Sequence, residues 1–156
     1  MTERTFWVCS TVVGPVTVIC DGEYIVGLRF GRCPPEDGRE ESTCLSERCF
    51  RQLEEYLAGG RQQFDLPLRV EGTVFQKKVW RALLAIPFGE TCCYADIAVR
   101  IGHPKACRAV GAASHNNPIP VVIPCHRVIG KNGDLTGYAG GIPVKKYLLN
   151  LEKTVV

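Results

Sequence analysis

The first thirty residues contain short apolar runs rich in β-branched and aromatic side chains, which are typical of β-strands. One run covers 5–9, and two more lie within 16–30 on either side of Asp21-Gly22. An Asp-Gly pair between such runs predicts a β-hairpin. Residues 31–41 are rich in glycine, proline and acidic side chains and are predicted to form a loop.

Helical spacing replaces this pattern from about Ser42. Apolar side chains then recur as on one face of a helix, at Leu45, Cys49, Leu53, Tyr56 and Leu57. Gly59-Gly60 is expected to end the helix. After it, apolar residues alternate as in a half-buried strand, at Phe64, Leu66, Leu68 and Val70. Residues 1–70 are therefore predicted to form a small α/β domain.

A second domain, 71–156, is predicted from the change of pattern at Thr73. Thr73 and Gln76 fit a capping box, which opens a helix that Pro87 and Gly89 are expected to close. The apolar residues of this helix are Phe75, Val79, Trp80 and Leu83.

Two shorter helices are predicted to follow. The first covers 94–101, Gly102-His103 forms a tight turn, and Pro104 begins a third helix that reaches about His115. A helix, a glycine-containing turn and a second helix at this spacing are typical of a helix-turn-helix, although many helical hairpins bind nothing.

The third helix is predicted to have two different faces. Ala106, Val110 and Ala113 fall on one side, and the basic or small residues Lys105, Arg108, Ala112 and His115 fall on the other. A helix near the minor groove of DNA, which is only ~6 Å wide, must carry little bulk apart from one inserted side chain, and Arg108 is the obvious candidate. Alternatively, Ala109, Gly111 and Ala112 permit close helix packing and Arg108 is a solvated charge.

Charge is unevenly distributed along the 156 residues. Residues 1–70 hold 8 Lys and Arg against 11 Asp and Glu, whereas 71–156 hold 11 against 5. The second domain is therefore the candidate for contact with a polyanion.

No apolar run is long enough to span a membrane, and the polar start at 1–6 lacks a secretory pattern, which predicts a cytoplasmic protein, or a nuclear one in a eukaryotic cell.

Nine cysteines are present, an odd number without paired CxxC spacing. In a chain without an export signal, this favours reduced thiols over a disulfide framework, and it gives little support to a metal site.

The segment 119–129 carries Cys125 and His126 at the end of an apolar run. Prolines at 118, 120 and 124 restrict its backbone, and Asn116-Asn117-Pro118 is turn chemistry that leads from the third helix into this segment. Such a pair can also be accidental, because buried cysteine is usually inert. If the stretch is a strand, His126 points away from the Cys125 sulfur, so a bridging water or a local turn would be needed to favour the thiolate.

A histidine that activates a thiol needs an acidic partner to hold its ring. Glu152 is the candidate: a buried stripe of Val144, Leu148 and Leu151 is predicted on the last helix, and Glu152 lies one turn beyond Leu148 at its edge. A surface glutamate is the alternative. Arg127 would add positive charge that favours the thiolate.

The sequence Pro124-Cys125-His126-Arg127-Val128 resembles the active-site signature of the 6-O-alkylguanine-DNA alkyltransferases. The similarity extends over nearly all of 66–152, through 72–76, Val79-Trp80, 86–89, Tyr94, Ile97-Ala98, 108–111, Asn117-Pro118, 137–141 and 145–152. It implies an α+β fold in which a small ribonuclease-H-like α/β lobe at 1–70 precedes a mainly helical, winged helix-turn-helix lobe with the active site.

The resemblance also implies a reaction and a partner. A methyl or other alkyl group of 6-O-alkylguanine in double-stranded DNA would pass irreversibly to Cys125 after the nucleotide is flipped out, without a cofactor or a metal, in a monomer; activity on 4-O-alkylthymine stays open. Arg108 would fill the gap in the base stack. The other expected DNA contacts are Lys105, Ala109, Gly111, Ala112, Ser114 and His115.

Further roles follow from the resemblance alone. Tyr94 would assist flipping and donate its hydroxyl proton to a guanine ring nitrogen. The carbonyls of Cys125 and Val128 would accept from the exocyclic amine, and the Ala139 amide, with Pro120 and Tyr138 as walls, would frame the alkylated oxygen. Asn117 would brace the turn before the nucleophile, and Glu152, His126 and a water would activate Cys125.

Three alternatives belong to other classes. A protein that only binds alkylated bases would typically lack the reactive cysteine. A helix-turn-helix regulator would read the major groove and would need a dimer or a second module. A cysteine hydrolase would require an oxyanion site, for which the sequence offers no glycine-rich candidate.

Overall fold

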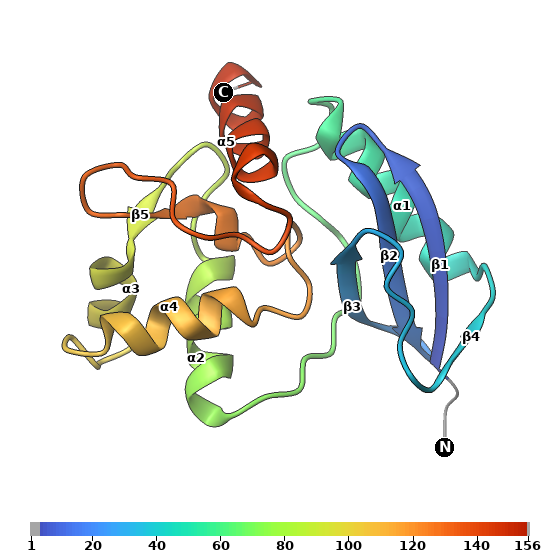
Figure 1. Cartoon of the computed structure of the whole chain (residues 1–156), viewed down its shortest axis with the longest axis horizontal. Helices are drawn as coiled ribbons and strands as arrows, with labels where there is room; N and C mark the ends of the chain where they lie inside the picture. Colours follow the sequence, from blue (N-terminus) through green and yellow to red (C-terminus); the bar gives the residue numbers. More distant parts are fainter. Residues whose placement is uncertain (1–3, 156) are drawn as a thin grey trace. The chain divides into compact units, whose positions relative to one another are not determined.

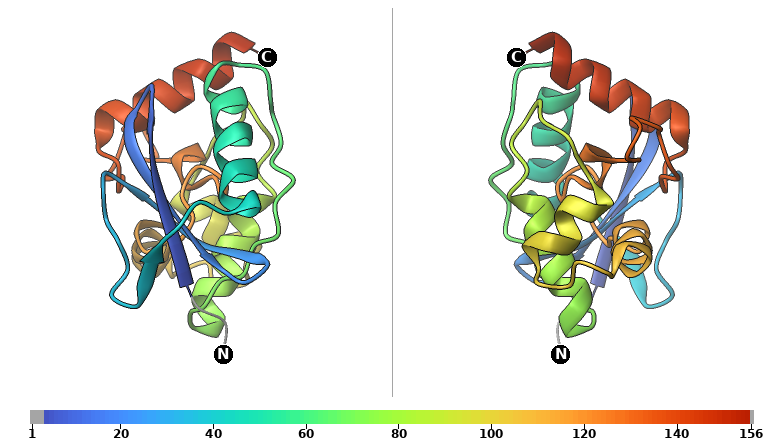
Figure 2. Two further views of the ribbon diagram at one scale, coloured as in Figure 1. Left: turned by 90° about the vertical axis from the view of Figure 1, so that its right-hand side faces the viewer. Right: turned by 90° about the vertical axis from the view of Figure 1, so that its left-hand side faces the viewer.

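The computed structural model describes residues 4–155, so that of the polar start at 1–6 only 4–6 lie within it. The chain forms two compact units, Met1–Val70 and Glu71–Val156. Figures 1 and 2 show a unit with a sheet and one helix, and a second, mainly helical unit. No helix of the described residues is long and apolar enough to span a membrane.

The first unit is built on a four-stranded sheet in the order β3-β2-β1-β4. The strands are β1 (Arg4–Thr11), β2 (Gly14–Asp21), β3 (Tyr24–Phe30) and β4 (Gly38–Glu40). β2 and β3 pair as the antiparallel hairpin predicted around Asp21-Gly22, and Gly22 adopts a positive φ of 61°. β4 pairs parallel to β1 within the segment that was predicted to be only a loop.

One helix, α1 (Cys44–Leu57), packs on this sheet, as predicted (Figure 1). The Thr43 hydroxyl accepts a hydrogen bond from Ser46 N, and Gly59 after the helix has a positive φ of 84°. Its buried face meets the sheet to form the core of this unit, with side chains that include Val16, Val18, Ile25, Leu28, Cys49, Leu53 and Tyr56.

The strand predicted at 64–70 is wrong, because the segment makes only one bridge, between Leu68 and Ile25. Ile25 N donates to Pro67 O at 2.8 Å and Arg69 N donates to Ile25 O at 3.0 Å. Pro67 has no N–H to extend a ladder, which explains why the alternating apolar pattern does not become a strand.

The second unit places three helices around a common core: α2 (Val74–Leu84), α3 (Tyr94–Arg100) and α4 (Cys107–His115). The capping box of Thr73 and Gln76 is present at the start of α2. Trp80 of α2 donates its ring N–H to Ala113 O of α4 at 2.8 Å, which fixes the two helices together.

The end of α2 agrees with the prediction, whereas the start of α4 does not. α2 ends at Leu84, before Pro87 and Gly89, which were expected to close it. α4 begins at Cys107 rather than at Pro104, because 104–106 belong to a turn closed by Ala106 N donating to His103 O at 2.9 Å.

The remaining elements bring distant parts of this unit together. A parallel pair joins β5 (Cys92–Cys93) to β6 (Val128–Ile129) and thereby places the start of α3 beside the segment that follows Cys125. A 3-10 helix, η1 (Cys125–Arg127), precedes β6, and a turn-rich loop leads from β6 to α5 (Ile142–Val155). Figure 1 shows η1 and β6 between α4 and α5.

Candidate active site

The loop 116–124, which internal hydrogen bonds hold in place, connects the end of α4 to Cys125. Asn117, which is buried, accepts a hydrogen bond from Ile119 N at 3.0 Å and donates to Ile123 O at 2.8 Å. Ile123 N closes the turn by donating to Ile119 O at 2.9 Å. Within it Val121 has a φ of 74°, a strained conformation for a β-branched residue. Such strain persists only where the surroundings enforce it, here through both ends of the Asn117 amide.

The backbone then turns sharply at Pro124, whose φ of −80° and ψ of 64° are those of an inverse γ-turn. Cys125 N donates to Ile123 O at 2.8 Å across this turn. The next three residues form η1 and not a strand, so the alternation considered for Cys125 and His126 does not apply. Both side chains are buried, with exposed fractions of 7% and 0%.

His126 and Arg127 share one buried partner, Glu152 of α5, which is 1% exposed. The Glu152 carboxylate lies 2.7 Å from His126 Nε2 and accepts from Arg127 Nε at 2.8 Å and Nη2 at 3.0 Å. Gly89 N also donates to it, at 3.1 Å. Because a carboxylate only accepts, this contact assigns the ring hydrogen of neutral His126 to Nε2, and Nδ1 is the basic nitrogen.

The predicted acidic partner of His126 is therefore in place, and the alternative of a surface glutamate is wrong. The predicted stripe of Val144, Leu148 and Leu151 is not what α5 buries. The buried residues are Lys145, Leu148 and Glu152, so Glu152 lies at the centre of the buried face.

Lys145 is a buried residue of this region that the sequence reasoning did not single out. Its ammonium donates to Val128 O at 2.8 Å and to Thr136 O at 3.3 Å. Its spacing to Leu148 and Glu152, three and seven residues, places all three on one helix face and was the available signal. Burial lowers the pKa of Lys145, and the proximity of Cys125 opposes this shift.

Opposing influences act on the pKa of the Cys125 thiol. Burial raises its pKa, and hydrogen bonding from Asn117 and the charge of Lys145 act to lower it. For His126, burial lowers the pKa, whereas the Glu152 carboxylate acts to raise it. The resting site thus favours a neutral thiol and a neutral imidazole, so the thiol must lose its proton to become a nucleophile.

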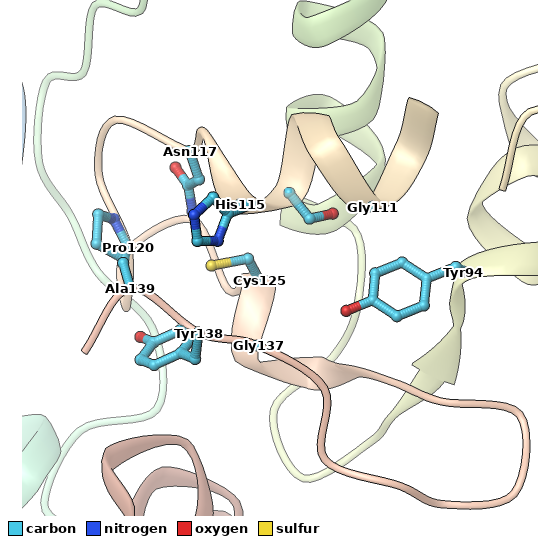
Figure 3. Close-up of a pocket in the computed structure, with 10 residues that line it drawn as sticks. Tyr94, Gly111, His115, Asn117, Pro120, Cys125, Gly137, Tyr138 and Ala139 are labelled. Atoms are coloured by element: carbon cyan, nitrogen blue, oxygen red, sulfur yellow. The ribbon is translucent and has the colours of Figure 1, made fainter. Parts of the chain in front are cut away.

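Cys125 is the cysteine that opens into the pocket shown in Figure 3. The pocket is lined by Tyr94, Gly111, Ser114, His115, Asn117, Pro120, Cys125, Gly137, Tyr138 and Ala139. The Cys125 sulfur and the Tyr94 hydroxyl both point into the space between α4 and the chain at 137–139. All the residues predicted to frame the base are therefore gathered here, except Val128, which is buried and does not line the pocket.

The exposed face of α4 is close to the predicted one. Arg108, Ala109, Ala112 and His115 are exposed on α4, and Lys105 is exposed in the turn before it. Val110 and Ala113 are buried as expected, whereas Ala106 is only half-buried and precedes the helix. Ser114 differs, because it is buried and lines the pocket, so it is not available on the outer face that was predicted to contact DNA.

Ion pairing differs between the two units. In the described part of Met1–Val70, six arginines pair with carboxylates: Arg4, Arg32, Arg39, Arg48, Arg61 and Arg69. In the described part of Glu71–Val156, Arg127 is the one arginine in an ion pair, and it is buried. The exposed cations of that part, none of which has an ion pair, are Lys77, Lys78, Arg81, Arg100, Lys105, Arg108, Lys131, Lys146 and Lys153.

Two other buried cysteines, Cys20 and Cys49, do not line this pocket. Cys20 and Cys49 are buried in the core of the first unit, where burial raises their pKa to about 11 and about 12. Such thiols stay protonated at neutral pH and are poor nucleophiles.

Within 4–155, no three His, Cys, Asp or Glu side chains lie together as metal ligands would.

Comparison with known families matches both units. The family described as 6-O-methylguanine DNA methyltransferase, ribonuclease-like domain, matches residues 6–70, and its DNA binding domain matches residues 74–154. These matches define a two-domain protein with a ribonuclease-like part followed by a DNA-binding part.

Individual relatives agree with this class. A methylated-DNA–protein-cysteine methyltransferase of Methanosarcina acetivorans is 48% identical over 144 residues, 90% of this chain and 92% of the relative. The constitutive methylated-DNA–protein-cysteine methyltransferase of Bacillus subtilis is 58% identical over 104 residues, 66% of this chain and 63% of the relative. The crystal structure of Mycobacterium tuberculosis OGT in complex with DNA superposes with a TM-score of 0.92 at 42% identity, covering 97% of this chain and 94% of that one. The chain belongs to the 6-O-methylguanine DNA methyltransferase family.

Proposed function

We propose that this chain repairs DNA by direct damage reversal, transferring a methyl or other alkyl group from 6-O-alkylguanine to Cys125. The observation that carries the proposal is a buried thiol that opens into a pocket and is followed directly by a histidine bound to a buried carboxylate. The outer face of α4, which is small and basic, lies at the rim of the same pocket through Gly111 and His115. Membership of the family supports the same reaction.

Activation of the thiol is assigned to Glu152, His126 and a water molecule. Glu152 fixes the ring of His126 and directs its basic nitrogen, Nδ1, away from the carboxylate. The Cys125 proton can then pass through a water to Nδ1. Arg127 is held by Glu152 and by Ile86 O at 2.7 Å, so it positions the carboxylate. Lys145 supplies the nearby positive charge that stabilises the thiolate.

The transfer is a displacement at the alkyl carbon. The Cys125 sulfur forms a bond to this carbon while the bond between the carbon and guanine O6 breaks, and the electron pair returns to the guanine. Tyr94 donates a proton to a ring nitrogen, which offsets the developing charge, and it then regains a proton from solvent, while His126 releases to solvent the proton that it took from Cys125. The thioether is stable, so each molecule reacts once. Because thiolate and proton donor come from the chain itself, the step requires neither a cofactor nor a metal.

The remaining pocket residues are assigned to recognition of the flipped base. Pro120 and Tyr138 form walls, and the amide of Ala139 faces the alkylated oxygen. The carbonyls of Cys125 and Val128 accept from the exocyclic amine. Each already accepts one hydrogen bond, from Val128 N and from Lys145 Nζ respectively, but a carbonyl oxygen has two lone pairs.

DNA is proposed to bind along α4 in the minor groove, as double strand. Lys105 contacts phosphate, and Ala109, Gly111, Ala112 and His115 let the helix approach closely. Arg108 is exposed and is the long side chain that can fill the space left by the flipped nucleotide. The protein is expected to act as a monomer, in the cytoplasm or in a eukaryotic nucleus.

Replacement of Arg108 by alanine should slow repair of duplex more than reaction with free 6-O-methylguanine, because only the duplex requires a side chain in the gap. Unstacking a base costs a few kcal/mol, so a loss on the order of 10-fold to 100-fold on duplex is expected. Rates of Cys125 alkylation on the two substrates measure the difference. Lys153→Ala on α5 is the matched control. Equal loss on both substrates would contradict the wedge role.

The proposed function as a whole is tested by incubating the purified chain with duplex that contains one 6-O-methylguanine. We expect the protein to gain the mass of one methyl group, located on the peptide that holds Cys125, and unmodified guanine to appear in equal amount. A chain that repaired many lesions without gaining mass would contradict the proposal.

A further inference from the structure

Tyr94 has a partner that the assigned roles do not use. Its hydroxyl forms a hydrogen bond with the hydroxyl of Thr136, which lies 42 residues further along the chain. Thr136 immediately precedes Gly137 and Tyr138, which line the pocket, and it is only partly exposed. The bond therefore joins the beginning of α3 to the loop that forms the opposite side of the pocket.

The position of Thr136 is fixed by groups other than Tyr94. Lys145 Nζ donates to Thr136 O at 3.3 Å and to Val128 O at 2.8 Å, so one buried ammonium connects the Thr136 backbone to the segment after Cys125. Gly130 N donates to Asp134 O at 2.7 Å and closes the preceding turn. Because β5 pairs with β6, the start of α3 is attached to the same segment. Both hydroxyls are thus held relative to Cys125.

From this geometry we infer that Thr136 is a positioning residue for proton donation by Tyr94, an inference that rests on the proposed function. When Thr136 donates to the Tyr94 oxygen, the phenolic hydrogen is directed to another acceptor, the guanine ring nitrogen. A hydrogen bond donated to the phenolic oxygen also stabilises the charge that develops there as the proton leaves. Thr136 is not among the residues that line the pocket, so its effect passes through Tyr94.

The test compares Thr136→Val, which keeps the shape and removes the hydroxyl, with Thr136→Ser, which keeps the hydroxyl. The rate constant of alkyl transfer to Cys125 under single-turnover conditions is measured on duplex with 6-O-methylguanine. Thr136→Val should lower it roughly fivefold to tenfold, the size expected for one hydroxyl hydrogen bond, with unchanged affinity for the duplex. Thr136→Ser should restore the rate. Thr154→Val, at the exposed end of α5, is the control.

A double-mutant cycle separates this role from a structural one. In a Tyr94→Phe background, Thr136→Val should have no further effect, because the acceptor of its hydrogen bond is already gone. An equal loss in both backgrounds, a rate for Thr136→Val equal to that of the natural chain, or a failure of Thr136→Ser to restore the rate would each overturn the inference. Should Thr136→Val unfold, Thr136→Ala replaces it in the cycle. If the natural chain itself gains no methyl group, the proposed function fails instead.

Discussion

Replacement of Cys125 by serine should reduce alkyl transfer from duplex 6-O-methylguanine to the level found without protein. A serine hydroxyl is ionised far less readily than a thiol and is a poorer nucleophile toward alkyl carbon. The change removes little volume from a site that is 7% exposed, so the variant should stay folded and still bind the lesion. Intact-mass measurement and a gel-shift assay on the same duplex check both expectations.

The matched control is Cys44→Ser in the first unit. Cys44 is an exposed thiol, and a non-specific reaction of accessible cysteines would occur there first. We expect Cys44→Ser to gain one methyl group at the rate of the natural chain. Methylation that persists in Cys125→Ser and disappears in Cys44→Ser would show that Cys125 is not the acceptor.

Replacement of Glu152 by glutamine should affect both stability and rate. The change keeps the shape but removes the charge opposite buried Arg127, and breaking a buried ion pair typically costs about 3–5 kcal/mol of unfolding free energy. It also removes the group that opposes the fall in the pKa of His126 caused by burial. A less basic and less well-oriented imidazole should slow transfer on the order of 100-fold.

Stability and chemistry can be separated by temperature. Transfer is measured at a temperature where circular dichroism shows Glu152→Gln to be fully folded, so that slow reaction is not loss of folded protein. Lys153→Gln, the exposed neighbour on α5, should change neither quantity. If Glu152→Gln reduced thermal stability but left the transfer rate unchanged, the role assigned to Glu152 and His126 in activating the thiol would be wrong.

The helices and the hairpin of this chain were predictable because local chemistry determines them. The capping box at Thr73, the Asp21-Gly22 turn and the glycine after α1 each act over a few residues, and each is found where it was expected. The strand predicted at 64–70 failed because Pro67, within the run, has no N–H for a ladder, a feature that is visible in the sequence, and because pairing also requires a neighbouring strand edge. The parallel partner of β1 in 38–40 could not be seen from its own residues.

Some residues of the candidate site were likewise predictable from local sequence, and others were not. Cys125, His126 and Asn117 belong to one short segment, so their proximity follows from the sequence. Glu152 was inferred from helix periodicity, but its place at the centre of the buried face depends on Lys145 also being buried, against the usual behaviour of lysine. The contact between Tyr94 and Thr136 joins residues whose spacing carries no periodic signal, and the folded loop alone reveals it.

The contrast in ion pairing bears on how ionic strength should control DNA binding. Cations already neutralised by carboxylates displace few of the counterions condensed on a duplex, whereas those without partners, on Glu71–Val156, can displace them. Raising salt should therefore weaken binding through that unit, by about 0.9 in the slope of log affinity against log salt for each phosphate contact. Titrations at several salt concentrations should show a shallower slope for Lys105→Ala and an unchanged slope for Arg32→Gln, because Arg32 is paired with Glu40.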